Sequence, residues 1–291
     1  MGKYLKKFET HTEYEAFTAT SEFIKPNVSL CVEENEVHYN PYVHDYSQDY
    51  LTFEALEDGT FQFIKPINYS IDNGNTWVAL AADTSTPTIT SGDKIMWKAT
   101  LTPSYSGIGT FSSTGNFNVE GNPMSLLYGD NFVGQTDLTG KDNALATLFY
   151  ICSKLINAKN LSLPATTLAN QCYDSMFRGC TSLTTAPELP ATTLANQCYD
   201  SMFRGCTSLT TAPQLPATTL AKECYYDMFY GCTSLNYIKA MFTTTPSNTY
   251  TSNWVSGVAA SGTFVKNSAA TWTTTGVNGI PSGWTVQTAS A

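Results

Sequence analysis

The sequence predicts a modular, mainly β protein with a small N-terminal α+β module, a β-sandwich, a repeat solenoid and a β-rich C-terminal cap. Three observations support this fold class: near-identical copies of one segment, strand-like segments before them, and a Thr- and Ser-rich stretch after them. Of the 291 residues, 42% are hydrophobic and 13% aromatic, which is enough for a core. Charged residues make up 13%, about half the usual share. This composition favours folded, Thr-lined β surfaces over disorder.

The charge and the apolar pattern exclude several classes of partner. The net charge is −9, and a nucleic-acid-binding protein or one that binds anionic membranes would need a basic face. The longest apolar run, 144–151, is far shorter than the roughly 20 residues that cross a bilayer. The first residues carry lysines but no apolar segment. We therefore expect no nucleic-acid partner, no membrane insertion and no Sec signal peptide.

Residues 1–50 form the predicted N-terminal attachment module. A short helix is expected near 13–17, and the alternating segment 28–40 predicts a hairpin that turns at Glu34 and Asn35. The module has four lysines against nine acidic residues, so a basic surface on its docking partner would fit it. His38 and His44 are interpreted as surface or hydrogen-bonded histidines rather than metal ligands.

Residues 51–136 predict an immunoglobulin-like β-sandwich, because short alternating segments are separated by Gly, Asn and Asp turns. Within them, 70–77 (SIDNGNTW) resembles the Asp-box, a hairpin device of sialidase propellers. We expect Asp72 to close its own turn and Trp77 to lie in the core. A sialidase needs an Arg cluster for its substrate carboxylate, and 1–136 contains no arginine, so a glycosidase is not favoured.

Residues 137–240 carry the strongest signal, an internal repeat. The segment LPATTLANQCYDSMFRGCTSLTTAP at 163–187 recurs unchanged at 189–213, and a third copy follows at 215–239. A fixed period of 26 residues with Leu and Cys at set offsets is typical of a leucine-rich-repeat solenoid. Within one copy, 168–177 predicts a short helix and 180–186 a short strand. The cysteines stand eight and eighteen residues apart, unlike zinc ligands, so we expect buried thiols and no metal.

The repeat resembles a known subclass. Phe177, Cys180, Leu183 and Thr184 match the F-x-x-C-x-x-L-T pattern of BspA-like leucine-rich repeats, which recurs at 203–210 and, with Asn236 at the last position, at 229–236. Proteins of this subclass are typically surface adhesins. The opening KYLKKFETHTEYEAF together with KPNVSLCVEENEVHYNPY is similar to a short module on head or tail fibre proteins of crAss-like phages, which infect gut bacteria of the Bacteroides type.

Stacking of the coils would align equivalent residues in columns and so create a candidate ligand-binding face. Aromatic, acidic and Arg side chains suit the ring faces and hydroxyls of carbohydrates. The alternative is a solvated face on which stacked tyrosines only stabilise the array. The predicted ligand-binding residues are Tyr173, Tyr199, Tyr225, Asp174, Asp200, Arg178 and Arg204.

Residues 241–291 contain three tryptophans and two strand-like segments, 262–267 and 283–288, and are predicted to cap the last coil. The chain contains no G-x-S-x-G, H-E-x-x-H or phosphate-loop motif, so we expect neither enzymatic activity nor a cofactor.

The preferred hypothesis is a phage virion protein, a capsid-attached head fibre or decoration protein or a tail fibre, on the virion surface. Its expected partners are other virion structural proteins through 1–50 and a host-surface polysaccharide or protein, in a homo-oligomer with a trimer favoured. The alternative is a BspA-like bacterial cell-surface adhesin that binds host glycoprotein or matrix. The receptor and the choice between head and tail stay open.

Overall fold

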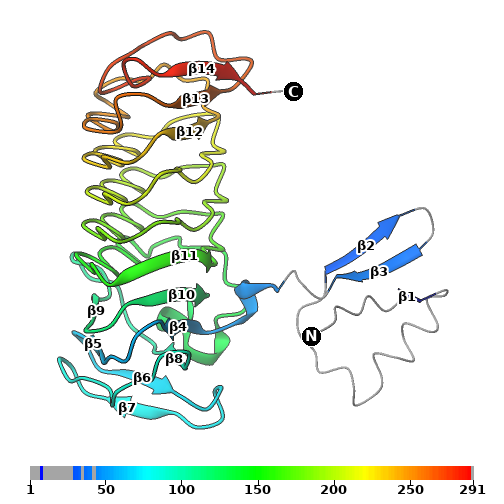
Figure 1. Ribbon diagram of the computed structural model, residues 1–291, viewed down its shortest axis with the longest axis vertical. Coiled ribbons are helices and arrows are strands. Elements are labelled where there is room, and N and C mark those ends of the chain that lie inside the picture. Colours follow the sequence, from blue (N-terminus) through cyan, green and yellow to red (C-terminus); the bar gives the residue numbers. More distant parts are fainter. Residues whose placement is uncertain (1–6, 9–28, 34–35, 41–43, 290–291) are drawn as a thin grey trace.

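The computed structural model describes residues 7–8, 29–33, 36–40 and 44–289 (Figure 1). The described part is mainly β with almost no helix. It contains one helical turn, α2 (Ser125–Tyr128), and the 3₁₀ turns η1 (Tyr46–Gln48) and η2 (Gly129–Asn131). No helix of the described residues is long and apolar enough to cross a membrane.

The N-terminal strands form a small antiparallel sheet in the order β1–β3–β2. Its strands are β1 (Lys7–Phe8), β2 (Ser29–Glu33) and β3 (Glu36–Asn40). The predicted hairpin is confirmed by the pairing of β2 with β3, from Ser29 opposite Asn40 to Glu33 opposite Glu36. Its turn and the predicted helix near 13–17 lie outside the described residues.

A six-stranded sheet in the order β11–β10–β4–β8–β6–β7 closes one end of the stack of coils in Figure 1. Its pairs are antiparallel except β10 with β11, which is parallel. The sheet crosses the expected boundary between residues 136 and 137, because β11 belongs to the repeat region. Its strands are β4 (Leu51–Ala55), β6 (Ile67–Ser70), β7 (Val78–Leu80), β8 (Lys94–Lys98), β10 (Phe117–Gly121) and β11 (Leu155–Leu161).

A two-stranded antiparallel sheet, β5 (Phe61–Phe63) with β9 (Phe111–Ser113), supplies further phenylalanines to the same core. Phe53 of β4 lies between them, with ring centroids 5.3 Å from Phe61 and 4.8 Å from Phe111. Both faces of β4 are largely covered, since Thr52 and Phe53 are both buried and only Glu54 is partly exposed.

The turn between β6 and β7 confirms one prediction and corrects another. Asp72 closes its own turn, because it accepts hydrogen bonds from the Thr76 amide at 2.9 Å and the Ser70 hydroxyl at 2.7 Å. The expectation that Trp77 lies in the core is wrong. Its ring is partly exposed and packs on Tyr50 at 4.9 Å, with the Lys98 ammonium 4.2 Å from its centroid.

The repeat copies make one coil each, and the coils lie on one another (Figure 1). Amide groups of alternate residues donate to carbonyls of the next coil, for example Tyr173 to Cys198 at 3.0 Å and Phe177 to Met202 at 2.9 Å. The remaining amides close turns within the coil. The helix predicted at 168–177 is therefore wrong, because half of its amides are directed into the next coil and positive φ angles at Gln171, Ser175 and Gly179 interrupt any helix.

The opposite side of each coil also corrects the prediction. The strand expected at 180–186 is reduced to a single bridge, in which Thr185 pairs in parallel with Asn157. Regular strands form only at the two ends of the stack in the described chain: β11 at one, and β12 (Tyr237–Ala240), β13 (Thr263–Lys266) and β14 (Thr285–Thr288) at the other. Prolines and small Thr residues fill the same position in the central copies.

The segment 249–256 covers the last repeat coil, where Phe229 donates to the Trp254 carbonyl at 2.8 Å and Gly231 to that of Ser256 at 2.7 Å. Trp254 and Trp272 are buried, and β13 and β14 match the two predicted strands.

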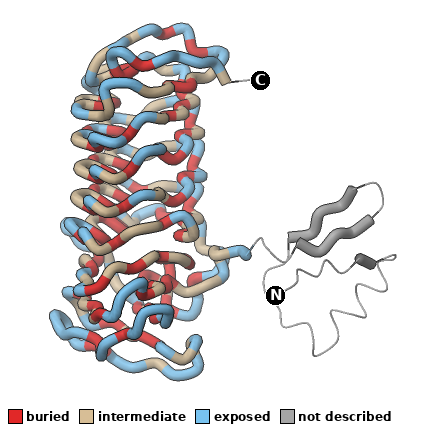
Figure 2. The backbone as a smooth tube through the Cα atoms, in the orientation of Figure 1, coloured by how far each residue is buried: buried red, intermediate tan, exposed pale blue. Residues whose placement is uncertain are grey.

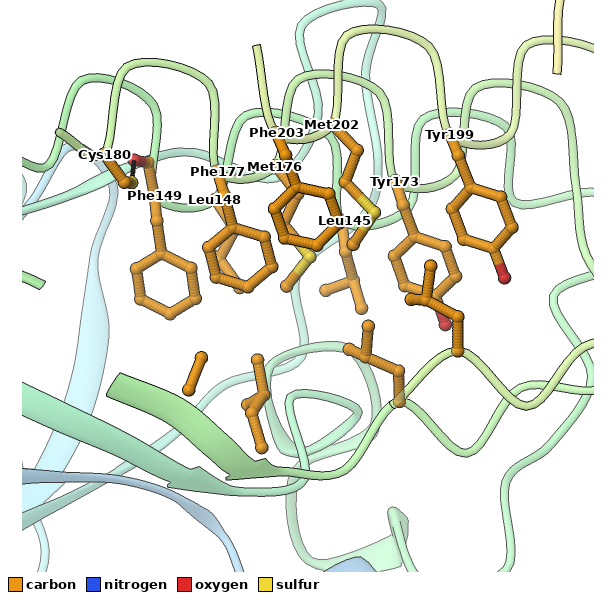
Figure 3. Close-up of a cluster of buried hydrophobic side chains, with 14 of the residues drawn as sticks. Leu145, Leu148, Phe149, Tyr173, Met176, Phe177, Cys180, Tyr199, Met202 and Phe203 are labelled. Atoms are coloured by element: carbon orange, nitrogen blue, oxygen red, sulfur yellow. Dashed lines mark hydrogen bonds between the residues drawn. The ribbon is translucent and has the colours of Figure 1, made fainter. Parts of the chain in front are cut away.

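One continuous apolar column joins the sheets to the coils, as the buried residues along the axis in Figure 2 show. Phe111, Phe149, Phe177, Phe203 and Phe229 follow one another at centroid spacings of 5.4 to 6.0 Å. The close-up in Figure 3 shows Phe149, Phe177 and Phe203 of this row beside the buried Met176 and Met202. The seven repeat-series cysteines are buried free thiols, and the thiol of Cys180 donates to the Phe149 carbonyl at 3.0 Å.

Candidate functional site

The turns of the coils place the predicted aspartates and arginines on one flank of the stack. Each coil bends every fourth residue, at positions equivalent to Gln171, Ser175 and Gly179. Between two bends the first two residues are buried and the third is partly exposed, so Met176 and Phe177 lie in the core while Arg178 reaches the surface. Equivalent residues of successive coils therefore form columns along this flank.

The tyrosines of the predicted site do not reach that flank. Tyr173, Tyr199 and Tyr225 are at most 2% exposed and stack with near-parallel rings at 5.7 and 6.1 Å (Figure 3). Burial raises the pKa of all three phenols well above the ordinary value. The expectation that these rings face a carbohydrate is wrong, because the side chain next to Cys172 turns into the core with it. The alternative, a stabilising stack of tyrosines, describes their packing.

The predicted acidic residues lie at the edge of the core and are half-buried. Partial burial raises the pKa of Asp174, and it raises that of Asp200 to about 7, with further contributions from the neighbouring carboxylates of Asp174, Asp227 and Glu223. The Ser201 hydroxyl donates to Asp200 at 2.8 Å and partly opposes this effect. Asp200 thus changes charge near neutral pH.

The predicted arginines lie in one column on the flank, between two exposed tyrosines. The guanidinium of Arg178 lies 5.7 Å from the centroid of Tyr150, and that of Arg204 lies 4.4 Å from the centroid of Tyr230. Arg204 also forms an ion pair with Asp227, a residue of the next coil that is 3% exposed. The column therefore runs Tyr150, Arg178, Arg204, Tyr230, with one residue contributed by each coil.

Tyr150, Tyr226 and Tyr230 are the aromatic rings that this flank exposes, by 36 to 39%. They are not among the ligand-binding residues that the sequence predicts. Tyr226 and Tyr230 stand where the other copies carry Asp200 and Arg204, so the departure of the third copy from the repeat was the available signal. Asp227 was the second signal, since it replaces the serine of the identical copies.

We find no second candidate binding site in the rest of the described chain. Within residues 44–289, no group of three or more His, Cys, Asp or Glu side chains could hold a metal ion. His44 pairs with Asp49, as expected of a hydrogen-bonded histidine. An open hollow of about 190 Å³ lies in the cap between Val255, Val258, Val277 and Pro281, and it carries no charged side chain.

No protein-family model, curated protein or solved structure matches this chain.

Proposed function

We propose that this chain is a non-enzymatic phage virion protein, a head fibre or decoration protein or a tail fibre, whose coils contact glycans on the host surface. In this proposal the coils are leucine-rich repeats of the BspA-like subclass, the sheets at 51–136 are a β-sandwich, and residues 1–50 attach the protein to the particle. The observation that carries it is the Tyr150–Arg178–Arg204–Tyr230 column, which a rigid core holds in register. Aromatic and Arg side chains at a fixed spacing fit a repeating polymer such as a polysaccharide.

The junction between the attachment segment and the body is defined by contacts. The Tyr46 hydroxyl accepts a hydrogen bond from Asn160 at 2.8 Å, and the Tyr50 hydroxyl donates to Asp130 at 2.7 Å. Residues 45–50 therefore pack with the sheet, and a truncation that begins at residue 44 keeps these contacts. We expect this truncated protein to fold, to bind host cells and to be missing from assembled particles.

Peptide mass spectrometry of gradient-purified particles and of the cell-envelope fraction tests the proposal. Peptides at fixed stoichiometry in intact particles support a virion protein. Peptides confined to the envelope would instead support the BspA-like adhesin, which the F-x-x-C-x-x-L-T pattern also favours. Size-exclusion chromatography with light scattering checks the proposed homo-oligomer, for which a trimer is expected.

A further inference from the structure

The two identical copies place the same arginine in different surroundings. Arg178 and Arg204 occupy equivalent positions in 163–187 and 189–213. The residue that can reach each guanidinium from the next coil is not the same: it is Asp227 for Arg204, but Ser201 for Arg178. The third copy has changed at this position, so the sequence alone already distinguishes the two arginines.

The charge of Arg204 is neutralised inside the protein. Its guanidinium donates to Asp227 and lies over Tyr230, so it is held toward the following coil. This ion pair offsets the positive charge of the guanidinium with a buried carboxylate, which weakens its attraction for an anionic ligand.

The charge of Arg178 has no such partner. Among the residues that the structure describes, it forms no ion pair, and it lies toward the preceding coil beside Tyr150. Tyr150 is 37% exposed and its neighbour Ile151 is 61% exposed, so an apolar surface adjoins the guanidinium. Asp174 of the same coil acts on Arg178 electrostatically but forms no ion pair with it, and burial raises the pKa of that carboxyl.

We propose that Arg178 and Tyr150 form the subsite for an acidic sugar, with the carboxylate of a uronic acid on the guanidinium and the sugar ring against the tyrosine. This inference rests on the proposed function and specifies the ligand class of that same flank. A planar guanidinium binds a carboxylate through two parallel hydrogen bonds, and the ring of a sugar presents apolar C–H groups to an aromatic face. The paired Arg204 does not contribute.

The test uses the full-length protein and three polysaccharides with different uronic acids: polygalacturonate, alginate and hyaluronan. Each is compared with its methyl ester, which removes the charge and keeps the sugar. We expect at least one acid to bind at least tenfold more tightly than its ester. Arg178→Gln should reduce that affinity by about tenfold to a hundredfold, as expected for a lost bidentate, charge-assisted contact.

Two exchanges test the asymmetry between the copies without removing either arginine. Ser201→Asp gives Arg178 the partner that Arg204 has, and it should reduce binding as strongly as Arg178→Gln. Asp227→Ser frees Arg204 and should raise the number of acidic sugars bound per chain. Lys222→Gln is the control, because it removes one positive charge from an exposed residue outside the column.

The inference is overturned if no acid is preferred over its ester, or if Arg178→Gln and Lys222→Gln have the same effect. Adsorption of the same variants to host cells separates the two proposals. Wild-type adsorption that Arg178→Gln retains would reject the acidic-sugar subsite and keep the glycan-contact function. Absence of the protein from particles would reject the virion function whatever the sugar binding shows.

Discussion

The sheets of residues 51–121 (the base) and the coils that follow them share one core, but their buried rings pack at different angles. Around Phe53 the rings meet at steep angles, 79° to Phe111 and 51° to Trp97, because each comes from a strand with its own direction. In the coils the rings are nearly parallel, with 1° between Phe177 and Phe203. Because successive coils have the same backbone path, the rings of equivalent residues lie in nearly parallel planes. In the base, side chains of different shape and orientation therefore fit together, whereas in the coils equivalent side chains stack in register.

Removing a buried aromatic ring from the base or from the coils is expected to have the largest effect on stability. Phe53→Ala and Phe203→Ala both delete fully buried side chains, and each should lower the free energy of unfolding by about 3–5 kcal/mol. Denaturant unfolding followed by near-ultraviolet circular dichroism measures the loss. Hydrogen exchange should then separate the two regions: for Phe203→Ala, the loss of protection concentrates in the adjoining coils, since each coil contacts only its neighbours. An equal loss over the whole chain would contradict this difference.

Glycines with positive φ provide a second comparison between the base and the coils, with a smaller expected effect on stability. A Cβ at Gly121 of the base would lie 2.0 Å from the Tyr50 carbonyl oxygen, so the chain would have to move. At Gly205 in the coils the nearest atom is 3.8 Å away, and Gly205→Ala adds only the strain of positive φ, roughly 1–2 kcal/mol. We expect Gly121→Ala to lower the unfolding midpoint clearly more than Gly205→Ala. Equal midpoints would show that the base yields as easily as the coils.

Asp200→Asn tests the half-buried carboxylates of the coils through pH. The pKa of Asp200 is raised, chiefly by burial, from 3.8 to about 7, so the folded protein keeps a proton that the unfolded chain has released. The stability of the wild type should therefore fall as the pH rises from about 4 to 7. Asn has no proton to lose, so the variant should be as stable as the wild type near pH 4 and more stable at pH 8. Unfolding curves at these two pH values measure the difference, and a constant difference would contradict the assignment.

The sequence predicts the hairpin at 28–40 and the strands at 262–267 and 283–288 well, because each depends on alternation that can be counted. The sequence does not predict the backbone conformation within a single coil. The segment 168–177 has helix-like composition, yet its amides pair with the next coil, and such pairing depends on a neighbour that local preference does not include. The same cause explains Tyr173: spacing reveals the column but not the direction in which it points. Arg178 was predictable as a residue, and the change from Ser201 to Asp227 can be seen in the sequence, but only the structure shows that Asp227 pairs with Arg204.

The smallest expected effect lies in the hairpin turn of the base, where a carboxylate behaves in the opposite way to Asp200. Hydrogen bonds from the Thr76 hydroxyl and amide, and then from Ser70, lower the pKa of Asp72 from 3.8 to about 2. Its contribution to stability is therefore complete above about pH 4 and is lost as the pH falls through about 2.

Asp72→Ala should speed hydrogen exchange at the Thr76 amide at neutral pH and leave the global unfolding midpoint nearly unchanged. The Gly74 amide is the internal control, because it donates to Ser70 at 2.9 Å and keeps its acceptor in the variant. Unchanged exchange at Thr76 would mean that β6 and β7 alone hold the turn. A selective increase would establish that the base stabilises an exposed charge with local donors, whereas the coils disfavour a charge that they partly bury.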